Sequence, residues 1–110
     1  MTPELVERAQ AGDPDAFTLL IEARLDRMYR LALAILGHEA DARDAMQETM
    51  TAMWRDLPTL RDPTRFDVWS DRILVNACRL ALRRRARSRV SHRILVTPPT
   101  TAAISSIALA

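Results

Sequence analysis

A chain of 110 residues with 48% hydrophobic and 27% charged residues has the size and balance of one small globular domain. Its charges are unevenly placed, because all fourteen acids and eight of the sixteen Arg precede residue 72, whereas residues 72–110 contain eight Arg and no acid. The net charge of +2 therefore hides a dipolar chain, which indicates two different partners. A single cysteine, Cys78, excludes an internal disulfide and is expected to be a buried, inert thiol.

Several functional classes are not expected from this sequence. No signal peptide is recognised, and no apolar run approaches the about 18 residues of a membrane span, so a cytoplasmic protein is expected. His38 and His92 have no Cys, Asp or Glu at metal-ligand spacing, and both glycines mark helix ends rather than a phosphate-binding loop. We therefore expect neither an enzyme nor a bound metal or cofactor.

The first half of the chain predicts two helices. Thr2 and Pro3 begin a short helix that Gly12 ends, and Asp13-Pro14 begins a longer one that runs to Gly37. Arg24 falls inside the core stripe of the longer helix, so it either extends to the surface or pairs with an acid on a neighbour. The stripe consists of Phe17, Leu20, Ile21, Met28, Leu31, Ala32 and Ile35.

A third amphipathic helix is predicted over residues 39–56. Its apolar face contains Ala42, Ala45, Met46, Thr49, Met50 and Met53. Its polar face contains Asp41, Asp44, Gln47, Glu48, Thr51 and Arg55. This polar face is either an ordinary solvated surface or, because Trp54 borders it, a protein-binding patch. Trp54 itself is either an exposed anchor for a partner or a contact at the edge of the core.

A loop with two prolines leads to one long helix, predicted over residues 64–90, and residues 91–110 are expected to be a mostly disordered tail. The core face of the long helix is predicted to contain Phe66, Trp69, Ile73, Ala77 and Leu80. An exposed row beside it contains Arg65, Arg72, Asn76, Arg79 and Arg83. Positive side chains stabilise the C-terminal end of a helix by interacting with its dipole, but this alternative explains only the arginines near the end of the helix. The row fits a surface that binds nucleic acid phosphates, single-stranded or double-stranded. The fold expected overall is an all-α bundle of about four helices.

Short blocks at consistent spacing over residues 4–90 resemble region 2 of bacterial extracytoplasmic-function sigma factors. The most specific are the pattern DAxDxxQE from Asp41 and the pattern FxxWxxRIxxN from Phe66. Weaker blocks are LVERAQAGD at 5–13, AF at 16–17, YRLA at 29–32 and WR at 54–55. This chain departs from the family pattern at Ser70, where an apolar residue is usual, and at residues 80–85, which lack the family's usual acidic residue.

The resemblance implies two partners. One is the clamp helices of the RNA polymerase β′ subunit, facing Asp44, Gln47, Glu48, Thr51, Trp54 and Arg55. The other is the unpaired non-template strand of a promoter −10 element, facing Arg61, Arg65, Arg72, Asn76, Arg79 and Arg83. The family captures a flipped base in a pocket of the loop before the last helix, here residues 60–64, with Arg72 and Asn76 nearby.

The resemblance ends near residue 90, and the helix-turn-helix domain with which these sigma factors read a −35 element has no counterpart in the sequence. The chain is therefore expected to be a truncated or frame-shifted sigma factor or a region 2 module used alone. Two other functions stay open. One is a module that docks on polymerase or an anti-sigma factor without opening a promoter, and the other is a helical bundle that binds nucleic acid without sequence preference.

Overall fold

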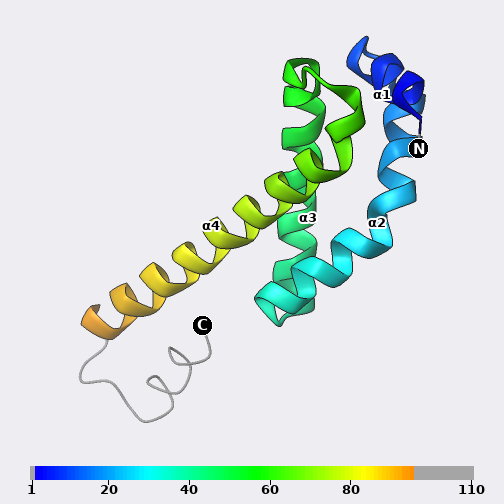
Figure 1. Ribbon diagram of the computed structural model, residues 1–110. Coiled ribbons are helices and arrows are strands. Elements are labelled where there is room, and N and C mark those ends of the chain that lie inside the picture. The colour runs from blue at the N-terminus through cyan, green and yellow to red at the C-terminus, as the bar shows by residue number, and fades with distance from the viewer. Residues whose placement is uncertain (1, 96–110) are drawn as a thin grey trace.

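The computed structural model describes residues 2–95, and their side chains through Ser88. It contains four α-helices (Figure 1): α1 (Pro3–Gln10), α2 (Pro14–Leu36), α3 (Glu39–Asp56) and α4 (Phe66–Leu95). Two 3-10 turns, η1 (Leu57–Thr59) and η2 (Pro63–Arg65), join α3 to α4. No strand occurs within residues 2–95, so the predicted all-α bundle is confirmed.

The helices begin and end at the residues that the sequence marks. The Thr2 hydroxyl accepts a hydrogen bond from the Leu5 N–H at the start of α1, and the Asp13 carboxylate accepts from two N–H groups at the start of α2. Gly37 ends α2 with a φ of +76°, a left-handed conformation that glycine adopts without steric cost. The bounds of α3 coincide with those predicted, Glu39 and Asp56.

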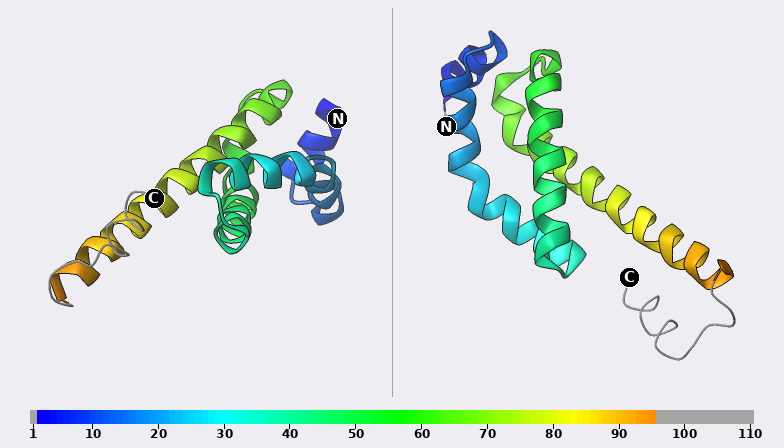
Figure 2. Two further views of the ribbon diagram at one scale, coloured as in Figure 1. Left: turned by 90° about the horizontal axis from the view of Figure 1, so that it is seen from below. Right: turned by 180° about the vertical axis from the view of Figure 1, so that it is seen from behind.

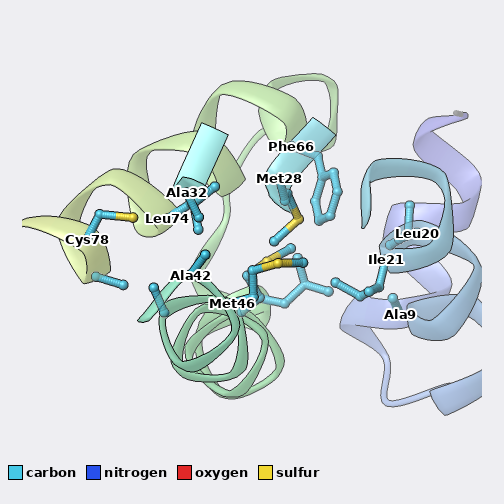
Figure 3. Packing of buried hydrophobic residues seen from close by; sticks show 14 of the residues in the cluster. Ala9, Leu20, Ile21, Met28, Ala32, Ala42, Met46, Phe66, Leu74 and Cys78 are labelled. Carbon is cyan, nitrogen blue, oxygen red and sulfur yellow. The ribbon is translucent and has the colours of Figure 1, made fainter. Parts of the chain in front are cut away.

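The core lies where α2 and α3 run side by side and α4 crosses them (Figures 1 and 2). Figure 3 shows part of this cluster, with Ala9, Leu20 and Ile21 of α1 and α2 at one end and Leu74 and Cys78 of α4 at the other, where Ala32 of α2 also lies. Fully buried side chains such as Met28, Met53 and Phe66 fill its centre. The small residues Ala32 and Ala42 belong to the same cluster, and small side chains let helices approach closely at a crossing.

The core face of α4 differs from the predicted one. Phe66 and Ala77 are buried as expected, but Leu80 is 42% exposed and Leu74 is buried instead. Cys78 is fully buried, as expected. Ser70 is also fully buried, because its hydroxyl donates a 2.9 Å hydrogen bond to the Asp67 carbonyl and leaves no unsatisfied donor in the core. Apolar residues cover more than one side of this helix, and packing against α2 and α3 selects the side that is buried.

Arg24 pairs with acids on a neighbouring helix, which settles the two alternatives for this residue. Its guanidinium lies 2.9 Å from Asp67 and 2.6 Å from Asp71, both on α4, and only 10% of its side chain is exposed. Arg27 also contacts Asp71, at 3.0 Å. Arg24 and Arg27 of α2 thus pair with the last acids of the chain, Asp67 and Asp71. These ion pairs hold the start of α4 against α2.

The second half of α4 extends away from the other helices (Figures 1 and 2). The described structure measures 57 Å along its longest axis and 22 Å across, because α4 projects beyond the bundle. Residues 86–88 of this projecting part are exposed. The helix continues to Leu95, past the end expected at Val90. The rest of the predicted tail, residues 96–110, and the side chain of His92 lie outside the described residues.

None of the helices within residues 2–95 combines the length and the apolar composition of a membrane span.

Candidate functional site

The polar face of α3 is open to solvent along three turns. Its opposite side, with Ala42, Ala45 and Met46 among others, packs into the core, so the helix is held rigidly with one face outward. The outward side chains proposed for a protein partner are Asp44, Gln47, Glu48, Thr51, Trp54 and Arg55, and all six are exposed.

Trp54 combines the two alternatives that the sequence left open. Its side chain is 43% exposed, yet its ring meets Phe17 of α2 edge to face, with ring centroids 5.0 Å apart and an interplanar angle of 63°. This geometry is a favourable aromatic pair. The indole is therefore packed against α2, and its exposed part is presented beside the polar face as an aromatic surface.

Ion pairs join α3 to the second half of α4. Arg84 lies 2.8 Å from Glu48. Arg85 pairs with Asp41 and also donates to the Leu36 carbonyl at the end of α2. Asp41, predicted on the solvent side, is therefore partly enclosed between α3 and α4. The sequence did not indicate these roles for Arg84 and Arg85. It shows one acidic helix and one basic helix, but not which of their residues form pairs.

These pairs border a groove of about 670 Å³ between α3 and α4. Its acidic wall comes from α3, with Asp41, Asp44 and Glu48, and its basic wall comes from α4, with Arg84 and Arg85. Both walls carry charged side chains, and the groove is open to solvent. The arrangement suits charged groups of a partner rather than a small apolar ligand.

The row predicted on the last helix lies on an exposed side of η2 and α4. Asn76 and the four arginines of the row, Arg65, Arg72, Arg79 and Arg83, are all exposed. Among the ion pairs of the described side chains none involves these four arginines. In this they differ from Arg84 and Arg85. The row therefore presents guanidinium groups that make no ion pair with a carboxylate of the described residues.

A second hollow, of about 220 Å³, lies between the loop before α4 and the first turns of α4. Trp69 lines this hollow, and its ring also packs on Phe66, with ring centroids 5.9 Å apart. Val68, 52% exposed, is an apolar wall that the sequence did not single out. The residues lining this pocket are Leu60, Arg61, Asp62, Arg65, Val68, Trp69 and Arg72.

Asn76 does not line the loop pocket, although Arg72 does. It lines a third groove, of about 610 Å³, together with Gln47, Glu48 and Thr51 of α3 and with the exposed Leu80. The residues assigned from the sequence to two different partners thus meet at one groove. Asn76 marks the border between the α3 face and the Arg row.

The loop that forms the pocket has a fixed local structure. The Asp62 carboxylate accepts hydrogen bonds from the Thr64 hydroxyl at 2.6 Å and from the Thr64 N–H at 3.0 Å. These bonds favour the ionised form and lower the pKa of Asp62 below its usual value. Pro58 and Pro63 stand in the first turn of η1 and η2, where their fixed φ is compatible with the helical turn.

No three His, Cys, Asp or Glu side chains of the described part of the chain come together as ligands for a metal ion. The surfaces around α3 and α4 offer hydrogen-bond donors, charges and aromatic rings.

Comparisons with known proteins agree on one family. The family model for sigma-70 region 2 matches residues 20–88. The chain is 37% identical over 71 residues to the "ECF RNA polymerase sigma factor SigE" of Mycolicibacterium smegmatis, which covers 64% of this chain and 27% of that protein. It is 36% identical over 81 residues to "SigM" of Mycobacterium tuberculosis, covering 74% and 41%. With the "ECF RNA polymerase sigma-E factor" of Haemophilus influenzae, identity is 31% over 91 residues, covering 83% and 48%.

The chain spans between about a quarter and a half of the length of these relatives. No solved structure matches it at a significant level. The matched residues, 20–88, contain α3, the loop and the Arg row of α4, and they make up more than half of the chain. The chain belongs to the sigma-70 region 2 family.

Proposed function

We propose that this chain is a promoter-recognition module of the sigma type, a binding subunit and not an enzyme. It docks on the core RNA polymerase through the exposed face of α3 and holds the unpaired non-template strand of a −10 element on α4. The observation that carries the proposal is the meeting of two exposed surfaces at one groove. The α3 face supplies Gln47 and Glu48 there, and the Arg row supplies Asn76.

The Arg row supports binding of a nucleic acid strand. Arg72 and Arg83 lie about 16 Å apart along the axis of α4, so the row can follow a strand over more than one phosphate. Asn76 stands between them with an amide that can hydrogen-bond a base edge. Phosphate contacts supply most of the affinity in such a complex, whereas the amide contributes to sequence preference.

The loop pocket supports capture of an unstacked base. Trp69 and Val68 offer an aromatic and an apolar surface, and Arg61, Arg65 and Arg72 outnumber the one carboxylate of the lining, Asp62. Stacking of a base on an aromatic side chain stabilises single-stranded complexes by about 1–3 kcal/mol per base. This free energy offsets part of the cost of unstacking the base from a duplex.

The α3 face supports a protein partner. Trp54 is an aromatic residue that is anchored by Phe17 and surrounded by charged and amide groups, the composition typical of interface hot spots. Asp44 and Glu48 favour a partner with basic side chains. In the family that partner is the clamp-helix segment of the polymerase β′ subunit, and an anti-sigma factor would compete for the same face.

The test compares binding of fluorescently labelled oligonucleotides by anisotropy, with and without core polymerase. The proposal predicts tighter binding of a −10-like single strand than of a scrambled strand or the closed duplex. Equal affinity for every sequence would instead make the chain a nonspecific binder. Binding to polymerase without binding to any strand would make it a docking module, and either result contradicts the proposal.

A further inference from the structure

Gln10, the last residue of α1, holds the loop that precedes α4. Its side-chain amide nitrogen donates one hydrogen bond to the Leu60 carbonyl at 2.7 Å and one to the Leu57 carbonyl at 3.2 Å. The two acceptors stand 47 and 50 residues away in the sequence. A primary amide has two N–H donors, so one side chain satisfies both carbonyls.

The two carbonyls belong to the part of the loop that shapes the pocket. Leu57 begins η1 and is fully buried. Leu60 ends η1 in an extended conformation and itself lines the loop pocket. The contact is half-buried, so water competes poorly for these carbonyls. Besides Gln10, α1 packs against both η1 and η2.

We propose that Gln10 is a positioning residue for the DNA-binding loop, and that α1 is a brace that keeps the pocket in its receiving shape. The inference rests on the proposed function, because it concerns the same pocket. It adds an element to that function, since α1 precedes residues 20–88, which the family model matches. Gln10 does not line the pocket, so it acts through the backbone of Leu57 and Leu60.

The chemistry of the contact defines informative substitutions. Gln10→Leu keeps a similar volume and removes both donors. Gln10→Glu keeps the shape, but an ionised carboxylate is an acceptor only and would face two carbonyl oxygens. Glu7→Gln changes an exposed side chain on the same helix and serves as the control.

The first measurement is amide hydrogen exchange in the loop. The Leu60 N–H donates to the Leu57 carbonyl and the Arg65 N–H donates to the Asp62 carbonyl, so both report on opening of the loop. Loss of two hydrogen bonds should speed exchange of these amides by about tenfold or more, and more in Gln10→Glu than in Gln10→Leu. Exchange of the core amides of α2 and α3, and all exchange in Glu7→Gln, should be unchanged.

The second measurement is affinity for a −10-like single strand as a function of salt. A mobile loop must be ordered on binding, so Kd should rise about three- to tenfold in both Gln10 variants. The slope of log Kd against log salt should not change, because no phosphate contact is removed. A residue with a merely structural role would not weaken strand binding in a variant that remains folded.

The outcomes separate this inference from the proposed function. Unchanged exchange of the Leu60 and Arg65 amides in folded variants overturns the role of Gln10, whatever the strand affinity. Faster loop exchange with unaltered strand affinity also overturns it, because the brace then has no effect on binding. If the unmutated protein binds no strand, the proposed function fails, and the exchange data alone still decide whether Gln10 holds the loop.

Discussion

Arg84 of α4 donates a 2.8 Å hydrogen bond to Glu48 of α3, so a carboxylate on the face proposed for polymerase is already paired within the chain. The two side chains are 57% and 44% exposed. An ion pair this open to water contributes little to stability, about 0–1 kcal/mol. Glu48 can therefore exchange Arg84 for a basic group of a partner at small cost.

The α3 face is tested by replacing Gln47 and Glu48 together with Ala. The double variant should lose about 2 kcal/mol or more of binding free energy for a β′ clamp-helix fragment, while its helical content stays the same. Isothermal titration gives the affinity and circular dichroism the helicity. Glu22→Ala, an exposed acid on α2, is the control. A folded double variant that binds as tightly as the unmutated protein would refute the assignment.

Arg84→Met should act in the opposite direction. It removes a group that competes for Glu48 and a positive charge beside a basic partner, so affinity for the same fragment should rise severalfold. The free energy of unfolding should change by less than about 1 kcal/mol. Arg83→Met removes the same charge from a side chain without an ion pair among the described residues, so its effect should be smaller. Weaker binding by Arg84→Met would show that Arg84 itself contacts the partner.

Arg24→Met should destabilise the domain by about 1–3 kcal/mol, because it breaks charge-assisted hydrogen bonds from a side chain that is 10% exposed. Arg27→Met is the matched control, because it removes a contact to Asp71 from a side chain that is 65% exposed. Its effect should stay below about 1 kcal/mol. Urea unfolding measures both, and equal losses would contradict the difference in burial.

Stability should also fall at high pH through Cys78. Burial raises the pKa of the Cys78 thiol, so the folded state retains this proton when the unfolded state, with a pKa of about 8.5, has lost it. The contribution is fully present below about pH 8 and is lost as pH rises through the folded pKa. Cys78→Ala should therefore reduce the fall of the unfolding free energy as pH rises above about 8. A parallel decline in both proteins would contradict this origin.

The helices were predictable because single residues fix their ends. Asp13 caps α2 and Gly37 ends it in a left-handed conformation, and both effects act within a few residues of the chain. The exposed faces of α3 and α4 followed from the same local periodicity. The rotation of α4 did not, because Leu74 and Leu80 are equally apolar and only contacts with α2 and α3 distinguish them.

The contacts that shape the site were not predictable from the sequence. Arg24 was expected either to extend to the surface or to pair with an acid, and the acids that it pairs with lie more than 40 residues away, at Asp67 and Asp71. The hydrogen bonds from Gln10 to the loop have no local pattern either. Each depends on where the crossing of α4 places the loop, and this is a property of the whole bundle.

The central claim is that the Arg row of α4 follows the phosphates of an unpaired strand while Asn76 reads a base. Salt dependence of binding to a −10-like oligonucleotide tests it most directly, since each neutralised phosphate contributes about −0.7 to the slope of log K against log salt. Arg72→Ala and Arg79→Ala should each make the slope shallower by somewhat less than about one unit. Asn76→Ala should leave the slope unchanged and reduce the preference among base sequences. Unchanged slopes in both arginine variants would contradict the account.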